Sequence, residues 1–124
     1  MTEPGDTAAF RASVLKWVAK VPKGHLATYG QIALLAGFPR RPRQVGMILK
    51  GLPEDTRVPW HRIVNAQGYV PSKGRWWGAM VQIQRLREEG IAVEDDGTLD
   101  LSAHRWDPLG RGKERDRKGR QQRI

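Results

Sequence analysis

Apolar residues recur at helical spacing in several stretches of the chain, and the first stretch lies near its start. Its apolar residues are Phe10, Val14, Leu15, Trp17, Val18 and Val21. Residues three, four or seven positions apart share one face of a helix, so this pattern predicts a helix over residues 7–21. Asp6 or Thr7 can cap the start of this helix, and Pro22 interrupts it.

Two shorter helices follow, separated by a tight turn. Thr28 can cap a helix over 29–36, which Gly37 ends, and Pro42 suits the first position of a helix that runs to about Lys50. Such a pair is typical of a helix-turn-helix, and here the second helix has basic residues at its start. An ordinary pair of antiparallel helices is the alternative interpretation of the same pattern.

Short extended pieces are predicted in the second half of the chain. Residues 61–64 suit an extended piece, residues 65–68 have turn chemistry, and residues 69–70 are expected to form a paired strand. Residues 91–101 read as two short strands around an Asp-Asp-Gly turn. We therefore expect short β-hairpin elements beside the helices.

One longer helix is predicted over residues 76–89, with Gly90 just beyond its end. Beyond Ser102 no core-forming pattern remains. The sequence thus predicts a mainly α fold over residues 1–101, followed by an extended basic tail over residues 102–124.

The charge of the chain favours a polyanionic partner. Its 124 residues include 22 Lys and Arg against 13 Asp and Glu, a formal net charge of +9. Residues 111–124 hold seven basic and two acidic residues, and so account for +5 of this total. A basic surface attracts nucleic acid by its field and by counterion release. We expect the tail to be disordered when free and to add nonspecific DNA affinity, with a merely solubilising role as the alternative.

The composition also excludes several kinds of chemistry. The chain has no cysteine, which excludes disulfides, thiolate catalysis and sulfur-ligated metal. Its three histidines, His25, His61 and His104, lack metal-ligand spacing, so we expect no metal and no cofactor. No apolar run approaches the length of a membrane span, and no signal peptide is visible. A cytoplasmic, nucleoid-associated monomer is therefore expected.

Six short motifs follow one another in a characteristic order between residues 8 and 92. They are Pro22-Lys23-Gly24, Thr28-Tyr29-Gly30-Gln31-Ile32-Ala33, Arg43-Gln44-Val45-Gly46, Pro59-Trp60-His61-Arg62-Ile63-Val64, Gly68 and Glu89-Gly90. Each motif alone is weak, but together they resemble the DNA-binding domain of the O6-alkylguanine-DNA alkyltransferases. The alkyltransferase-like proteins of that family, in which tryptophan commonly replaces the acceptor cysteine, are the best match. The resemblance implies a winged helix-turn-helix-like architecture.

The resemblance places DNA-contacting roles on the helix-turn-helix. It implies that Arg43 enters the base stack in place of an extruded nucleotide and that Tyr29 helps to rotate that nucleotide out. It also implies that the recognition helix, with Gln44 and Gly46, lies in the narrow minor groove, where small residues are needed. The alternatives are a plain phosphate contact for Arg43 and a half-buried helix position for Tyr29.

Trp60 stands where the resemblance places the reactive cysteine. His61 and Glu89 match the residues that prepare the thiolate in the enzymes, and Leu52 stands where the enzymes have an asparagine. An indole N–H is a donor with no comparable nucleophile, so alkyl transfer by the family's mechanism is chemically unavailable. Trp60 is expected to floor a lesion pocket, or else only to fill space, and the His61–Glu89 pair can be purely structural.

Two further sets of residues belong to this expected site. The loop over 69–76 matches the segment that closes over a flipped base, and Ser72, Lys73 and Arg75 are its candidate lesion contacts. Arg62 is expected either to support the site or to contact a phosphate.

The resulting hypothesis is a protein that binds O6-alkylguanine in double-stranded DNA and flips it without removing the alkyl group. The resemblance implies nucleotide excision repair proteins as further partners and no membrane. Two rival hypotheses remain at this point. One is a DNA repair enzyme, either a methyltransferase or a glycosylase with Glu89 or an aspartate as its base; the other is a helix-turn-helix transcription regulator.

Overall fold

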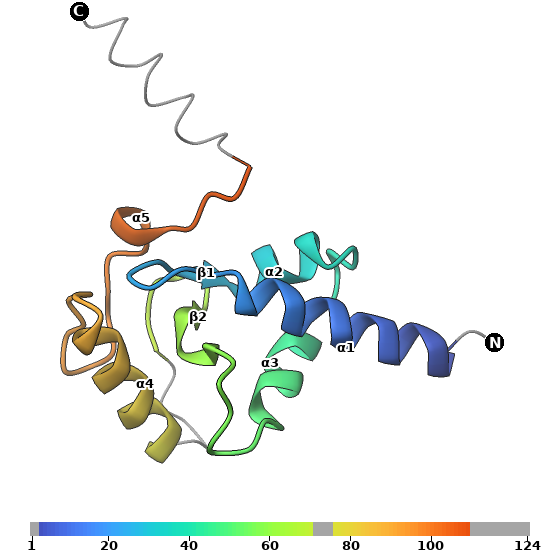
Figure 1. The fold of residues 1–124 in the computed structure, drawn as a ribbon. Helices are drawn as coiled ribbons and strands as arrows, with labels where there is room; N and C mark the ends of the chain where they lie inside the picture. Colours follow the sequence, from blue (N-terminus) through green and yellow to red (C-terminus); the bar gives the residue numbers. More distant parts are fainter. Residues whose placement is uncertain (1–2, 71–75, 110–124) are drawn as a thin grey trace, which may run out of the picture.

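The first apolar stretch forms the long helix α1 (Glu3–Ala19) in the computed structural model, which describes residues 3–70 and 76–109 (Figure 1). The helix begins four residues earlier than predicted and ends two residues earlier. Its end is continued by single turns, in which the N–H of Lys20 donates to Trp17 and that of Val21 to Val18. Val14, Val18 and Val21 are fully buried, so the predicted apolar face is confirmed.

The helix-turn-helix consists of α2 (Tyr29–Leu35) and α3 (Pro42–Lys50). The Thr28 hydroxyl caps α2 by accepting the Gln31 N–H at 3.0 Å, as the sequence predicted. Gly37 follows α2 with φ +92°, a conformation that β-carbons disfavour, and so turns the chain toward α3. Ile32, Val45 and Leu49 bury the faces that these two helices present to α1.

A two-stranded parallel sheet joins β1 (Ala27–Thr28) to β2 (Ile63–Val64), and a 3-10 turn, η1 (Trp60–Arg62), precedes β2. The extended piece expected at 61–64 thus includes β2, and its partner is the earlier strand β1. All four residues of the sheet are buried, so this short parallel sheet lies inside the core. The side-chain amide oxygen of Asn65 accepts the Gln67 and Tyr69 N–H groups and turns the chain away from β2.

The second half of the fold is built around α4 (Trp76–Glu88), which Gly90 ends with φ +88°. Residues 93–99 form a hairpin-like turn in which Val93 bridges Leu99, and Tyr69 bridges Thr98 in antiparallel fashion. Gly97 is required here, because a β-carbon on it would lie 2.7 Å from the Val70 carbonyl oxygen. The predicted strand at 69–70 thus exists only as this single bridge, with a partner later in the chain.

The chain after residue 101 continues to contribute to the domain, so the boundary predicted at that residue falls inside the fold. The last residue of helix α5 (Leu101–His104) and the two residues after it, residues 104–106, form a segment that we call the C-terminal strap. The Leu26 N–H donates to the His104 carbonyl at 2.8 Å, and the Trp106 N–H donates to the Leu26 carbonyl at 2.7 Å. The strap is held by backbone hydrogen bonds, which leave no apolar periodicity in the sequence.

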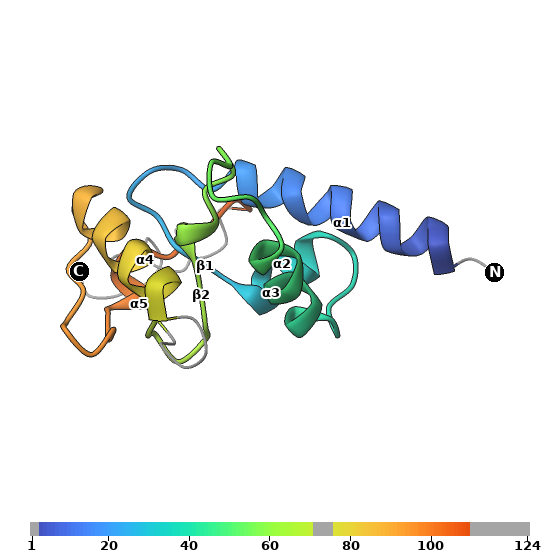
Figure 2. The same cartoon turned by 90° about the horizontal axis from the view of Figure 1, so that it is seen from below.

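The sheet lies between two hydrophobic clusters. In Figures 1 and 2, α1, α2 and α3 lie on one side of β1 and β2, and α4 lies on the other. The first cluster gathers residues of α1, α2 and α3, and the second gathers residues of α4 and the 91–99 segment. None of the helices in the described ranges is long and apolar enough to span a membrane.

Candidate nucleic-acid interface

The exposed face of the helix-turn-helix is formed by the start of α3 and by Tyr29. Arg43 lies in the first turn of α3, at the start of the helix where the sequence placed it, and both Arg43 and Gln44 are exposed. Gly46 lies one turn later against the Tyr29 ring, since a β-carbon on it would lie 3.7 Å from Tyr29 Cε1. That is an ordinary contact distance, so a β-carbon would fit here, and Gly46 is not required by the packing against the ring.

These residues border an open cleft of about 370 Å³. Its lining residues are Tyr29, Pro42, Arg43, Gly46, Met47 and Lys50. Met47 is 64% exposed, so its bulky side chain projects outward from α3. The cleft therefore combines an aromatic ring, an apolar methionine and two cations on one accessible surface.

Arg41 holds the turn that leads into α3, a role that was not predicted from the sequence. Its guanidinium lies 4.9 Å from the centroid of the Phe38 ring and 5.8 Å from that of Phe10, and these two rings meet edge to face at 4.8 Å. Cation–π contacts of this kind contribute about 0.5–1 kcal/mol each at exposed sites. The stack fixes the turn immediately before Pro42 and Arg43.

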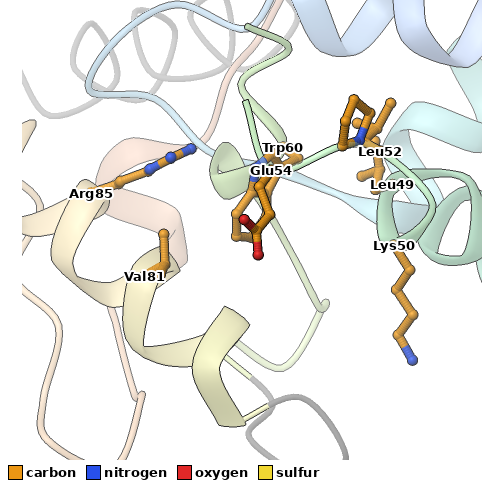
Figure 3. A pocket seen from close by; sticks show the side chains of 8 residues that line it. Leu49, Lys50, Leu52, Glu54, Trp60, Val81 and Arg85 are labelled. Carbon is orange, nitrogen blue, oxygen red and sulfur yellow. The ribbon is translucent and has the colours of Figure 1, made fainter. Parts of the chain in front are cut away.

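A second hollow, of about 320 Å³, adjoins the cleft and contains Trp60. Its lining residues are Leu49, Lys50, Leu52, Pro53, Glu54, Trp60, Val81 and Arg85. Figure 3 shows Arg85 and Val81 reaching from α4 toward Trp60, with Leu49 and Leu52 on the opposite wall. Lys50 lines both hollows, so the cleft and this Trp60 pocket are neighbours along α3.

Two charged residues of the Trp60 pocket were not predicted from the sequence. Arg85 places its guanidinium 5.6 Å from the centroid of the Trp60 ring, and Glu54 projects from the loop before Trp60. A signal for Arg85 existed in the spacing of α4. Val81, Arg85 and Glu89 are four residues apart, so they share one face of the helix and its extension.

Behind the Trp60 pocket, Glu89 gathers donors from three segments. His61 Nε2 lies 2.7 Å from Glu89 Oε2, and Arg62 donates to the same oxygen through Nη2 at 2.8 Å. The Gly24 N–H donates to Glu89 Oε1 at 3.0 Å. The predicted His61–Glu89 pair is therefore present, and it ties η1 and the loop after α1 to the end of α4.

Arg62 is an internal residue of this network. Besides Glu89, it donates through Nη1 to the Val21 carbonyl at 2.8 Å, and its side chain is only 17% exposed. Of the two roles that the sequence left open for Arg62, the geometry supports the first, support of the site. Its guanidinium is already bound on both sides by protein acceptors.

The network shifts the pKa values of both acidic and basic members. Burial alone would raise the pKa of Glu89, but hydrogen bonds from Arg62, the Gly24 N–H and His61 outweigh it and lower the pKa to about 2. Burial lowers the pKa of His61 below its ordinary 6.5, although the hydrogen bond to Glu89 opposes this effect. Glu89 is thus ionised and His61 neutral near neutral pH.

The neutral His61 must then carry its proton on Nε2, because an ionised carboxylate only accepts. Its other nitrogen, Nδ1, is buried and has no hydrogen-bond partner within the described ranges. The imidazole is therefore fixed by one hydrogen bond to Glu89, beside an indole in place of a thiol.

Several predicted residues lie outside the part of the chain that the structure describes. These are the lesion-loop candidates Ser72, Lys73 and Arg75, together with the basic residues of 110–124. Within residues 3–70 and 76–109, no group of three or more His, Cys, Asp or Glu side chains could hold a metal ion.

Comparison with known proteins identifies relatives over most of the chain. A sequence model of the family described as 6-O-methylguanine DNA methyltransferase, DNA binding domain, matches residues 9–91. A DNA base-flipping protein of Escherichia coli strain K12 is 44% identical over 98 residues, which are 79% of this chain and 74% of that protein. Alkyltransferase-like protein 1 of Schizosaccharomyces pombe is 36% identical over 103 residues, 80% of this chain and 95% of that protein.

Solved structures agree with these relatives and confirm the predicted fold class. The crystal structure of S. pombe Atl1 in complex with damaged DNA containing O6-carboxymethylguanine matches with a TM-score of 0.78 and 35% identity. The match covers 82% of this chain and 97% of that one. The O6-methylguanine methyltransferase of Mycobacterium tuberculosis matches with a TM-score of 0.57 and 29% identity, over 76% of this chain and 53% of that one.

Proposed function

The chain belongs to the family of the 6-O-methylguanine DNA methyltransferase DNA-binding domain, and from this we propose that it binds O6-alkylguanine in double-stranded DNA, flips the damaged nucleotide and leaves the alkyl group in place. One observation carries the proposal. The cleft with Tyr29 and Arg43 adjoins the Trp60 pocket through Lys50, in a chain that has no cysteine. A surface suited to DNA thus lies next to a pocket without a nucleophile.

The cleft supplies groups that nucleotide extrusion needs. Extrusion from a duplex costs a few kcal/mol of stacking and pairing. The exposed guanidinium of Arg43 at the start of α3 can replace part of the lost stacking, and the Tyr29 ring lies beside Gly46 on the same surface. The roles proposed for Arg43 and Tyr29 are therefore an inserted cation and a wedge against the backbone.

The pocket supplies a place for the extruded base. Its volume of about 320 Å³ lies at the lower end of the range for small-molecule sites. The Trp60 indole, Val81, Leu49 and Leu52 form apolar walls against which a base or an alkyl group can pack. Stacking of a base on an aromatic side chain contributes about 1–3 kcal/mol where it has been measured by substitution.

The chemistry available in the pocket argues against alkyl transfer. The transfer needs a nucleophile that keeps the alkyl group, and an indole N–H has no lone pair suited to this. His61 Nε2 is engaged by Glu89, and Glu89 is held by three donors, so neither side chain is free to replace a thiolate. We propose a non-catalytic protein that acts as a monomer and presents the lesion to nucleotide excision repair proteins.

A titration tests the recognition step. Duplexes that differ only in one O6-methylguanine are titrated with the protein at matched salt, and we expect at least roughly tenfold tighter binding to the lesion, or about 1.4 kcal/mol. Equal affinity for the two duplexes would refute lesion recognition. Trp60→Ala is the informative variant, since it should remove the preference while leaving binding to undamaged DNA intact.

Two further assays separate the rival activities. Labelled methyl groups on the DNA should remain there, because transfer to protein would indicate a methyltransferase and release of free base would indicate a glycosylase. Selection from random duplexes should give no consensus, whereas a defined consensus would indicate a transcription regulator. Excision of a lesion-bearing fragment by purified excision-repair proteins should become faster when this protein is added, and an unchanged rate would reject the coupling alone.

A further inference from the structure

The guanidinium of Arg85 has no acceptor among the residues that the structure describes, unlike those of Arg62 and Arg87. Arg62 is paired with Glu89 at 2.8 Å, and Arg87 is paired with Asp95 at 3.2 Å. The guanidinium of Arg85, two residues before Arg87, makes neither an ion pair nor a hydrogen bond with any residue that the structure describes. It lies instead over an aromatic ring.

The ring contact keeps the Arg85 guanidinium at the wall of the Trp60 pocket. The guanidinium carbon lies 5.6 Å from the centroid of the Trp60 ring, and the side chain is half-buried on α4 (Figure 3). A guanidinium held by a ring still has its N–H groups, which are five donors in a planar fork. The pocket wall therefore offers donors that no acceptor within residues 3–70 and 76–109 uses.

The other charges around the Trp60 pocket leave it with a positive excess. Lys50 lines the opposite wall, and Glu54, which is exposed, is the acidic residue among the lining residues. His61 lies behind Trp60 and is neutral near neutral pH, and Glu89 is already neutralised by Arg62. Two cations against one exposed carboxylate favour an occupant that carries negative charge.

We propose that Arg85 reads the chemistry of the adduct, so that the Trp60 pocket prefers O6 adducts ending in a carboxylate to neutral adducts of the same shape. A carboxylate matches the planar fork of a guanidinium and accepts two N–H bonds, and such charge-assisted bonds are about twice as strong as neutral ones. A carbamoyl group of the same size offers one acceptor and adds N–H groups of its own. This inference rests on the proposed function, because it requires the adduct to lie beside Trp60.

A matched pair of lesions tests the inference. O6-carboxymethylguanine and O6-carbamoylmethylguanine are adducts of the same shape, and the two duplexes that carry them have the same number of phosphates. The contribution of the DNA backbone therefore cancels in the ratio of the two binding affinities. We expect the wild-type protein to bind the carboxymethyl duplex roughly tenfold more tightly. Arg85→Gln should bring the ratio close to one, and Arg85→Lys should retain part of it.

The controls distinguish two roles for Arg85, which are recognition of the charge on the adduct and positioning of the Trp60 ring. Arg87→Gln removes one positive charge from the same helix without touching the pocket, so the ratio should stay at the wild-type value. A ratio near one in the wild-type protein would overturn the inference, and so would a wild-type ratio that survives Arg85→Gln. If Arg85→Gln weakened both lesions equally, Arg85 would only position Trp60, and the inference would again be wrong.

The same titrations distinguish this inference from the proposed function. An undamaged duplex is included with each protein. Equal affinity for all three duplexes would refute lesion recognition itself, whereas a lesion preference without a difference between the two adducts would refute only the role of Arg85. Arg85→Lys covers the case in which Arg85→Gln fails to fold, as judged from its circular dichroism.

Discussion

His61 and Glu89 are joined by a 2.7 Å hydrogen bond between side chains that are only 10% and 9% exposed, in a chain that has no thiol for them to activate. The pair connects η1 to the end of α4, while Arg62 and the Gly24 N–H occupy the other acceptor positions of the carboxylate. A buried carboxylate with three donors rigidifies the segments that it joins. The contribution of this network can therefore be measured as a change in the free energy of unfolding.

We expect acid to destabilise the fold in two stages. The first stage begins as the pH falls below 6.5, the ordinary pKa of a histidine. Because the pKa of His61 is lowered in the fold, His61 gains a proton more readily in the unfolded chain, and the free energy of unfolding falls. The second stage begins as the pH falls below 4.5, the ordinary pKa of a glutamate, because the pKa of Glu89 in the fold is about 2. The free energy of unfolding should fall by about 3 kcal/mol as the pH drops from 4.5 to about 2. Urea unfolding followed by circular dichroism from pH 8 to pH 2 measures both stages.

The two stages can be assigned by variants. His61→Gln should remove the stage below 6.5, and Glu89→Gln should remove the stage below 4.5 while lowering stability at neutral pH. An unfolding free energy that rises between pH 6.5 and pH 5 in the wild-type protein would contradict the sign of the His61 shift.

Arg62→Ala should destabilise the protein by about 3 kcal/mol, because it leaves the buried Glu89 carboxylate without its main counter-charge. Arg87→Ala breaks an ion pair whose side chains are 46% and 104% exposed, together with a hydrogen bond to the Val93 carbonyl, and as the control it should cost about 1 kcal/mol, less than Arg62→Ala. Urea midpoints compare the two variants. Unchanged stability with weakened DNA binding would instead make Arg62 a phosphate contact.

Arg43→Ala should abolish nucleotide extrusion while leaving part of the DNA affinity. With 2-aminopurine as the target base, the wild-type protein should raise the fluorescence as the base leaves the stack, and the variant should not. Arg40→Ala removes another exposed arginine three residues earlier and serves as the control for charge. Full fluorescence with Arg43→Ala would reduce Arg43 to a backbone contact.

Trp106→Ala should lower the unfolding free energy by about 2 kcal/mol, less than for a fully buried tryptophan, because the side chain is half-buried. Its ring packs on Trp17 at 6.3 Å between centroids, and its carbonyl accepts the Gln31 Nε2 amide at 2.8 Å. Leu109→Ala, at a position 60% exposed, is the control and should have little effect. Equal stability of the two variants in urea would show that the Trp106 ring does not contribute to the stability of the domain.

Truncation after Leu109 should weaken DNA binding mainly at low salt. The removed segment includes seven basic residues, and the slope of log K against log salt should fall by roughly 0.9 for each phosphate that the tail neutralises in the complete protein. A full-length variant with glutamine at those seven positions separates charge from length. An identical slope for the truncated and complete proteins would show that the tail does not bind DNA.

Local signals were sufficient to predict most helix boundaries. The helix expected from Pro42 to Lys50 has those bounds, and the predicted cap at Thr28 is present, because a proline at the first position and a side-chain cap act within one turn. The partner of β2 could not be predicted in this way. It lies in β1, and both short strands depend on burial in the assembled core.

In the candidate site too, some features could be predicted from the sequence and others depend on the tertiary structure. The His61–Glu89 pair followed from the order of motifs, whereas the choice between two roles for Arg62 required the position of the Val21 carbonyl. Arg41 and Arg85 were missed, because a contact between a guanidinium and a ring depends on tertiary structure and has no fixed spacing in sequence.

The C-terminal strap has a consequence for how this chain folds. Gln31 and Trp106 are 75 positions apart, and the Leu26 backbone is completed by the same late segment. Closing so long a loop is entropically costly and slows folding. During synthesis, the backbone of Leu26, directly before β1, therefore stays unpaired until the last part of the domain has been made. An unpaired strand edge is a template for association with other chains, so the nascent protein is most prone to aggregate just before the strap forms.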